Sequence, residues 1–175
     1  MGIIYAAVTD ALDGHPLTAV CDTETRLTSP AKKLLPSAHF YQDLKRMVEN
    51  EELDGVFICT SASTHSAIVT QITTRKPHTA LFVEKPLAPS FRWTHSKVET
   101  LHPSRQVTMV GFQRRFAGVF RRAKFVLDEA LGRLLFFRSH HYSSGVLARR
   151  AGWKFQKGDG GVTPEFGVHL LNLIH

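Results

Sequence analysis

Several features of membrane and secreted proteins are absent from this sequence of 175 residues. No apolar run reaches the roughly 20 residues that span a bilayer. The N-terminus also lacks the charged-then-apolar pattern of a signal peptide. The two cysteines, Cys21 and Cys59, lie at the ends of apolar runs without CxxC spacing. We therefore expect reduced, buried thiols in a cytoplasmic protein, with no transmembrane segment.

Metal-binding motifs, internal repeats and low-complexity tracts are absent too. The chain has 10 histidines, but no HExxH or CxxC accompanies them. The adjacent pair His140 and His141 would point to opposite faces of a strand. We therefore expect no metal site.

The chain carries a formal net charge of +7, with the positive charge concentrated in two clusters. These clusters comprise Arg114, Arg115, Arg121, Arg122 and Lys124, and then Arg149, Arg150, Lys154 and Lys157. A basic balance can indicate nucleic-acid binding, but no recognition motif accompanies it here. Solvated helix faces are the simpler interpretation, and nucleic acid is not the expected partner.

Helical and strand patterns alternate along the first two thirds of the chain. The expected helices are 3–13, 23–36, 43–50, 67–73 and 89–100. The expected strands are 17–21, 39–41, 56–59, 79–83 and 107–112. This alternation predicts an α/β fold with a doubly wound parallel sheet and right-handed connections.

After Phe112 the pattern changes. A helix with one apolar face comes next, and Gly132 would cap its C-terminus. A long strand over 134–142 and a loop over 143–162 follow, and Thr163 and Pro164 would then open a last helix. The expected helical face consists of Phe116, Phe120, Ala123 and Leu127. We therefore divide the chain into two units, residues 1–112 and 113–175, the second being the start of an α+β domain. The family resemblance described below implies that the first is an incomplete dinucleotide-binding domain and the second the start of a substrate domain.

The stretch from Leu81 to Leu87 joins an apolar run to an acid, a base and a proline. Such a run is typical of a buried parallel strand, so Glu84 and Lys85 would stand at its carboxyl end, where open α/β sheets bind ligands. Pro86 favours an extended backbone at Lys85. Lys85 could exchange protons there if partial burial lowers its pKa. The alternative is a solvent-exposed lysine paired with Glu84.

Three segments of this sequence together resemble one enzyme family. They are 84–86, the segment 59–65 at the end of the preceding strand, and 165–169 in the last helix. Residues 19–22 and 110–116 are also similar. The set resembles the glucose–fructose oxidoreductase / inositol dehydrogenase (Gfo/Idh/MocA) family of nicotinamide-dependent oxidoreductases over nearly the whole chain.

The resemblance implies a Rossmann domain, then an α/β domain with a large antiparallel sheet. It also implies hydride transfer between NAD(P) and a hydroxyl-bearing carbon of a sugar, cyclitol or related polyol, and a homo-oligomer at full length. Lys85 and His169 match the family's catalytic lysine and histidine. Chemically, His169 suits a general base and Lys85 a group that stabilises an alkoxide, while Glu165 shares a helix face with His169. A buried structural histidine is the alternative for His169.

Cofactor residues can be assigned on the same basis. Gly2 precedes the strand-end acid Asp22 by 20 positions, a spacing at which such acids bind the adenosine ribose. This favours NAD, with NADP as the other choice, unless Asp22 only caps the next helix. The other expected cofactor contacts are Thr60, Ser61, His65, Glu84, Lys85 and Gln113. His65 could equally be a helix residue without a ligand.

The sequence departs from the family pattern in several places. Of the strand and three glycines of the dinucleotide fingerprint, only Gly2 is present, so the central strand of the sheet is missing. The chain also stops within the His169 helix. Glu165 stands where the family usually has Asp, and Asn172 replaces a common acid. We therefore expect an inactive internal fragment, truncated at both ends. The alternative is a non-catalytic regulatory or partner-completed module.

Overall fold

The computed structural model describes residues 1–88, 107–133, 135–140 and 167–173. The helices of the first part are α1 (Gly2–Asp10), α2 (Thr25–Leu34), α3 (Leu44–Asn50) and α4 (Ala62–Arg75). Its strands are β1 (Ala19–Cys21), β2 (His39–Tyr41), β3 (Gly55–Ile58), β4 (Ala80–Val83) and β5 (Thr108–Val110). Helices and strands alternate as the sequence predicted. The expected helix over 89–100 lies outside the described residues.

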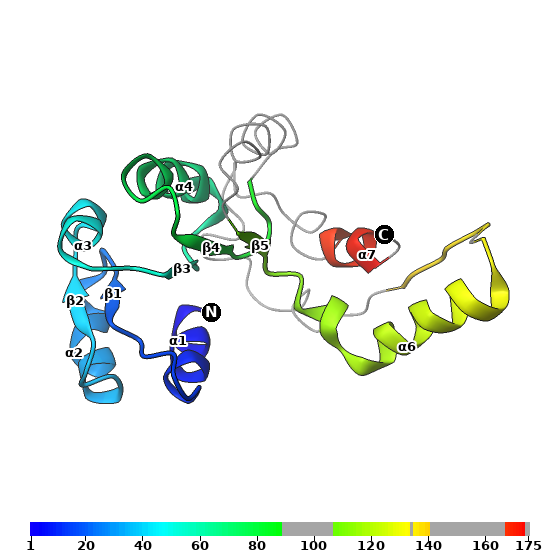
Figure 1. The fold of residues 1–175 in the computed structure, drawn as a ribbon, viewed down its shortest axis with the longest axis horizontal. Helices are drawn as coiled ribbons and strands as arrows, with labels where there is room; N and C mark the ends of the chain where they lie inside the picture. The colour runs from blue at the N-terminus through cyan, green and yellow to red at the C-terminus, as the bar shows by residue number, and fades with distance from the viewer. Residues whose placement is uncertain (89–106, 134, 141–166, 174–175) are drawn as a thin grey trace, which may run out of the picture.

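The strands form two separate parallel sheets, one of β1 and β2 and the other of β3, β4 and β5 (Figure 1). The Thr18 carbonyl and the Asp22 N–H, on either side of β1, bond to residues of β2. The carbonyl of Asp54, just before β3, and that of Ile58, at its end, accept N–H groups of the β4 chain segment. Peptide groups alternate in direction along a strand. In β1, Ala19 and Cys21 therefore turn their N–H and C=O groups away from β2. In β3, Gly55 and Phe57 turn theirs away from β4.

One apolar cluster holds both sheets together. Its buried members are Met47, Val48, Ile58, Val69, Ile72, Leu81 and Val83, from α3, α4, β3 and β4. Ala19, Cys21 and Tyr41 of β1 and β2 pack against this cluster. The covering helices are well specified locally, since the Asp43 side chain caps α3 by accepting the Arg46 N–H at 2.9 Å. The interruption of hydrogen bonding therefore does not separate the two sheets into independent bodies.

The opposite face of the larger sheet is thinly covered. Tyr5 of α1 contacts Phe57 and Phe82, and the three ring centroids lie 5.0–5.8 Å apart. Phe57 nevertheless remains 47% exposed. Within the described residues only α1 packs on this face, so the strand predicted over 56–59 is half-exposed here. The strand predicted over 79–83 is buried or partly buried throughout, as expected.

Beyond β5 the chain forms η2 (Gln113–Phe116), a single 3-10 turn, then α6 (Gly118–Val126), a π-helical turn η3 (Leu127–Leu131) and α7 (Val168–Leu173). Gly132 has a φ of +74° and its N–H bonds to the Leu127 carbonyl, so the predicted glycine cap is confirmed. The structure describes no helix long and apolar enough to cross a membrane.

Two element predictions differ from the structure. Helix α4 begins at Ala62, five residues before the expected start; Ser61 occupies the N-cap position, without a side-chain capping bond. Residues 135–140 form no strand, although a strand was predicted over 134–142. A strand requires a partner for its backbone groups, and Leu135 and Phe136 of this segment are largely exposed.

Candidate active site

Polar residues predicted to act together follow the carboxyl ends of the strands. Asp22 comes directly after β1, Thr60 and Ser61 follow β3, Glu84 and Lys85 follow β4, and Gln113 follows β5 by a short turn. In a parallel sheet these ends share one edge. The larger sheet therefore gathers residues from three strand ends along one edge.

The Glu84 carboxylate is fixed from two directions. One oxygen, Oε1, accepts the Tyr5 hydroxyl at 2.6 Å, and the other, Oε2, accepts the Lys85 N–H at 2.9 Å. Glu84 is buried, and a Cβ added at Gly111 would lie 3.2 Å from Oε1. A larger residue at position 111 would thus crowd the carboxylate. Glu84 is held as an internal anchor of the turn that carries Lys85.

Burial and the Glu84 charge also act on neighbouring groups. Desolvation, followed by the hydrogen bond to Glu84, raises the pKa of the Tyr5 hydroxyl far above its usual value. Desolvation and the same carboxylate raise the pKa of the Cys59 thiol to about 11. At neutral pH Cys59 is therefore a neutral thiol. Cys21 and Cys59 are both free, as predicted, but half-buried rather than fully buried.

His65 lies under the same edge and is almost completely buried, with 1% of its surface exposed. Its Nδ1 lies 3.0 Å from the Pro86 carbonyl oxygen and its Nε2 lies 3.0 Å from the Thr60 carbonyl oxygen. The ring therefore bridges the segments that follow β3 and β4. A neutral ring has one N–H and can donate it to only one of these two oxygens.

His169 lies near the end of β5. Its ring makes an edge-on contact with Phe112, with the ring centroids 6.3 Å apart, and the residue is buried. Gly111, the residue before Phe112, bonds through its N–H to the Val83 carbonyl and packs against Glu84. His169 and Lys85 are thus both linked to the same strand end. Glu165 lies outside the described residues.

The first turn of α1 also faces this region. A Cβ added at Gly2 would lie 3.6 Å from the Cβ of Cys59, which places the start of α1 beside the end of β3. The first N–H groups of a helix have no intrahelical acceptor and can bind a phosphate. In α1 the Ile4 N–H bonds to the Met1 carbonyl, so the N–H groups of Gly2 and Ile3 are the candidates. Asp22 accepts the Glu24 N–H at 2.8 Å through one oxygen and is exposed, so its second oxygen is available for a hydroxyl. These donors and acceptors fit a dinucleotide lying along the edge.

Two residues of the site were not singled out in the sequence. Tyr5 reaches Glu84 across 79 positions, and Arg115 donates through Nε to the Asn172 Oδ1 at 3.2 Å and through NH2 to the Asn172 carbonyl at 3.1 Å. Arg115 thereby ties η2 to α7, the helix of His169. No local pattern identifies such partners, because a tyrosine in a helix or an arginine in a basic cluster is common on any surface.

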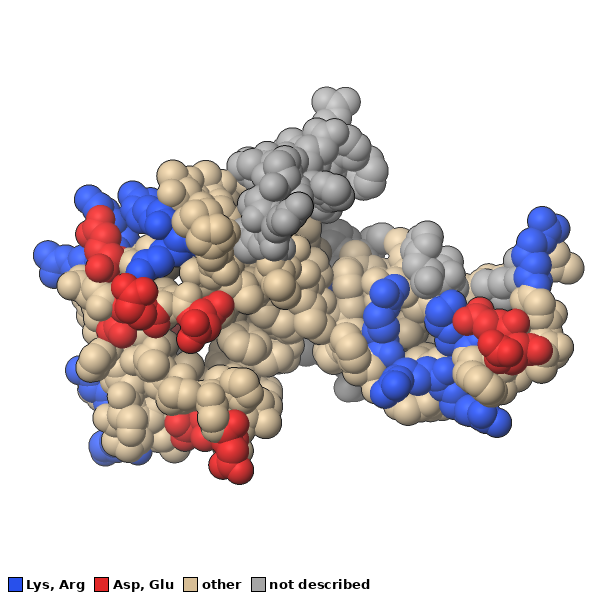
Figure 2. Space-filling model, in the orientation of Figure 1, with Lys and Arg blue, Asp and Glu red and all other residues tan. Residues whose placement is uncertain are grey.

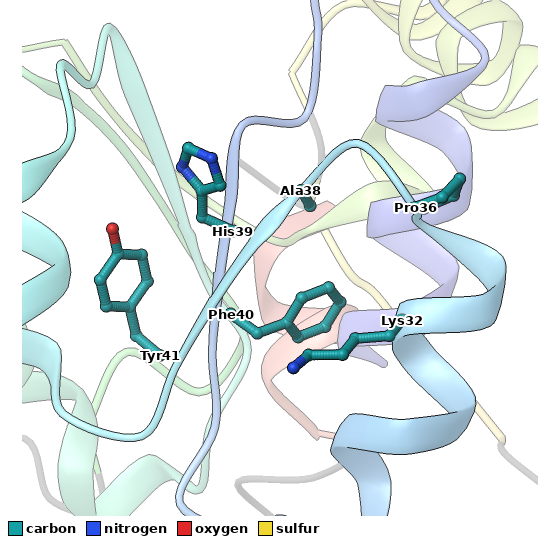
Figure 3. A pocket seen from close by; sticks show the side chains of 6 residues that line it. All are labelled: Lys32, Pro36, Ala38, His39, Phe40 and Tyr41. Atoms are coloured by element: carbon teal, nitrogen blue, oxygen red, sulfur yellow. The ribbon is translucent and has the colours of Figure 1, made fainter.

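A surface hollow of about 670 Å³ lies elsewhere, along β2. Figure 3 shows His39 and Tyr41 on one side of the strand and Phe40 with Lys32 on the other, so the hollow straddles an edge strand. On the first side, Tyr41 and His39 both bond to Glu51 Oε1, at 2.6 and 2.7 Å. These contacts account for the polar groups here without a ligand.

The basic residues are distributed unevenly over the surface. Figure 2 shows several lysines and arginines over the lobe of α6, with acidic residues beside them near its far end, and both kinds of charge spread over the rest of the visible face. Part of this charge is internally paired, since Lys124 lies 3.2 Å from Asp128 and Arg122 stacks on Phe125. The prediction that nucleic acid is not a partner stays a prediction.

Parallel strands, alternating helices and polar residues at the carboxyl edge define a Rossmann-type dinucleotide-binding protein. The family model described as "Oxidoreductase family, NAD-binding Rossmann fold" (GFO_IDH_MocA) matches residues 4–112. The chain belongs to this family, as its motifs predicted, and the predicted α/β Rossmann-like fold is confirmed.

Curated relatives and solved structures agree. Myo-inositol 2-dehydrogenase of Thermotoga maritima is 28% identical over 71% of this chain and 36% of its own length. Inositol 2-dehydrogenase 2 of Saccharopolyspora erythraea is 27% identical over 95% and 47%. The myo-inositol dehydrogenase of Lactobacillus casei, solved with NAD(H) and myo-inositol, is 28% identical with a TM-score of 0.66, covering 73% of this chain and 38% of that one. The chain therefore spans less than half the length of these relatives.

Proposed function

We propose that this chain carries the cofactor-binding half of an NAD(P)-dependent oxidoreductase that acts on a hydroxyl group of inositol or a related polyol. The observation that carries this proposal is the linkage of Lys85 and His169 to one strand end, through Gly111 and Phe112. Relatives named as inositol dehydrogenases support the substrate class. In this proposal residues 1–112 bind the cofactor, and 113–175 begin the substrate domain.

The residues divide the chemistry in a simple way. The first turn of α1 from Gly2, together with Thr60 and Ser61, would hold the phosphates, and Asp22 would hold the adenosine ribose. Bound NAD would accept the hydride. The His169 imidazole takes the hydroxyl proton, and the Lys85 ammonium stabilises the oxygen as negative charge develops. Gln113 would contact the nicotinamide, and Glu165 would assist His169.

Cofactor binding is the direct test. NADH and NADPH are titrated into the protein by calorimetry, with Asp22→Ala beside Asp54→Ala, an exposed acid that precedes β3 at the opposite edge of the sheet. Loss of the Asp22 carboxylate should weaken NADH and improve NADPH relative to it, because the ribose phosphate no longer meets a negative charge. Equal effects of the two variants would contradict the assignment of Asp22.

Turnover is followed as NADH formation from myo-inositol and scyllo-inositol. Where turnover is measurable, Lys85→Met and His169→Asn should each lower kcat by about 10²–10⁴-fold, the range for positioned acid–base groups. Lys45→Met, on an exposed face of α3, should leave kcat unchanged. A Lys85→Met protein with full activity would refute the role of the lysine.

We further propose that these 175 residues alone turn over weakly. The gap in hydrogen bonding between β1 and β3 supports this, because the fingerprint strand that normally leads into α1 occupies the centre of such sheets. A kcat of about 1–10³ s⁻¹ for the isolated chain, the usual range of complete enzymes, would contradict it.

The two strand edges also favour a second candidate, a module completed by a partner. The molar mass of the purified chain, measured by light scattering, distinguishes the two candidates. A defined assembly supports the partner-completed module, and a monomer of low stability supports the weak enzyme. The predicted homo-oligomer and cytoplasmic location stay predictions, the latter supported by the free thiols.

A further inference from the structure

The turn that carries Lys85 is held by side chains from two other elements, on opposite sides. On one side the Tyr5 hydroxyl of α1 binds Glu84. On the other, His65 of α4 binds the Pro86 carbonyl through Nδ1 at 3.0 Å. Lys85 lies between the two anchored residues. The backbone of the lysine is therefore constrained from both flanks.

The His65 ring is bound in a way that leaves little freedom. A carbonyl oxygen only accepts hydrogen bonds, so a ring nitrogen facing one must carry a proton to bond to it. Both nitrogens of His65 face carbonyl oxygens at 3.0 Å, and a neutral ring can donate to only one of them. The ring is buried, with 1% of its surface exposed. A buried carbonyl that loses its donor is costly, which resists movement of the Pro86 peptide.

We propose that His65 is a positioning residue for Lys85, acting through the Nδ1–H bond to the Pro86 carbonyl. The imidazole does not touch the cofactor in this arrangement; it fixes the turn from which the lysine reaches the reacting oxygen. The importance of that position rests on the proposed function. In this proposal His65 supports the turn of Lys85, in place of the cofactor contact that the sequence suggested.

Two amide substitutions distinguish the contact of His65 with Pro86 from its contact with Thr60. The amide nitrogen of asparagine stands close to the place of Nδ1, and that of glutamine close to the place of Nε2. His65→Asn therefore places a donor toward the Pro86 carbonyl and none toward the Thr60 carbonyl, whereas His65→Gln does the reverse. Both place a polar amide in the same buried position of α4, so they are matched in burial.

The readout is the acylation rate of the Lys85 amine under competitive labelling, measured by mass spectrometry relative to the exposed Lys45. His65→Gln should raise the Lys85 rate by up to about tenfold, the factor that one hydrogen bond to a buried group is worth. His65→Asn should stay close to the original protein. Equal changes in both variants, or no change in either, would overturn the proposal.

A second measurement needs no variant and decides the matter if both variants fail to fold. In protein labelled with ¹⁵N-histidine, the Nδ1 of His65 must show the chemical shift of a protonated nitrogen. An unprotonated Nδ1 would overturn the proposal, since that nitrogen could not bond to the Pro86 carbonyl. Neither readout uses NAD or inositol, so failure of the proposed function and failure of this inference remain distinguishable.

Discussion

Replacing Tyr5 by phenylalanine removes the hydroxyl that anchors Glu84 while retaining the ring that covers Phe57 and Phe82. The lost bond is 2.6 Å long, and its acceptor is a carboxylate only 4% exposed. Hydrogen bonds to charged groups contribute about 1.5–3 kcal/mol. Because Tyr5 is half-buried, we expect Tyr5→Phe to lower the free energy of unfolding by about 2 kcal/mol, near the low end of that range.

Urea unfolding at pH 7, followed by circular dichroism, measures this loss as a shift of about 1 M in the midpoint. Tyr41→Phe is the matched control, because Tyr41 also donates to a carboxylate at 2.6 Å but Glu51 keeps His39 as a second donor. The control should lose less. Equal losses in the two variants, or no loss for Tyr5→Phe, would refute the reasoning that Glu84 depends on this bond.

The pH dependence supplies an independent check. The pKa of Tyr5 is raised in the folded protein by burial and by Glu84, so the neutral hydroxyl is the favoured form. Its contribution is complete below about pH 10 and falls as the pH rises further, by at most about 1.4 kcal/mol per pH unit. The ionisation of Cys59 affects the stability of both proteins equally, so it drops out of the difference between them. The stability gap between Tyr5 and Tyr5→Phe should therefore narrow above pH 10, and a constant gap up to pH 12 would count against the assignment.

The remaining predictions concern other parts of the chain. Hydrogen exchange should be faster at the amides of Gly55 and Phe57, which turn away from β4, than at the central strand β4; equal protection would mean that this edge is covered. Asn172→Asp should raise the unfolding temperature by a degree or two, because Arg115 would then face a carboxylate, and an unchanged temperature in low salt would contradict this. Hydrogen bonds from Tyr41 and then His39 lower the pKa of Glu51, so its contribution is present above about pH 4.5 and lost as the pH falls. Glu51→Gln should flatten acid unfolding, and an unaltered acid limb would exclude Glu51 as its source.

The local elements were largely readable from the residues because their signals are local. The apolar stripe of Leu44, Met47 and Val48 predicted α3, and the apolar run ending at Glu84 predicted β4. Gly132 predicted the end of the helical segment after Phe116. Each depends on capping or periodicity within a few positions. The failure over 135–140 has the same origin, since an apolar run can indicate a strand but cannot supply its partner strand.

Sequence alone determined the family, the order of strands and helices, and the group of residues that stand at strand ends. Tertiary structure decided what those residues touch. Glu84 and His65 were expected to contact the cofactor, which stays a prediction. In the structure Glu84 accepts hydrogen bonds from Tyr5 and the Lys85 N–H, and the His65 ring lies between two backbone carbonyls. Such partners are brought together by packing of α1 and α4 against the sheet, over separations that no local pattern encodes, which is why the support of Lys85 became visible only in three dimensions.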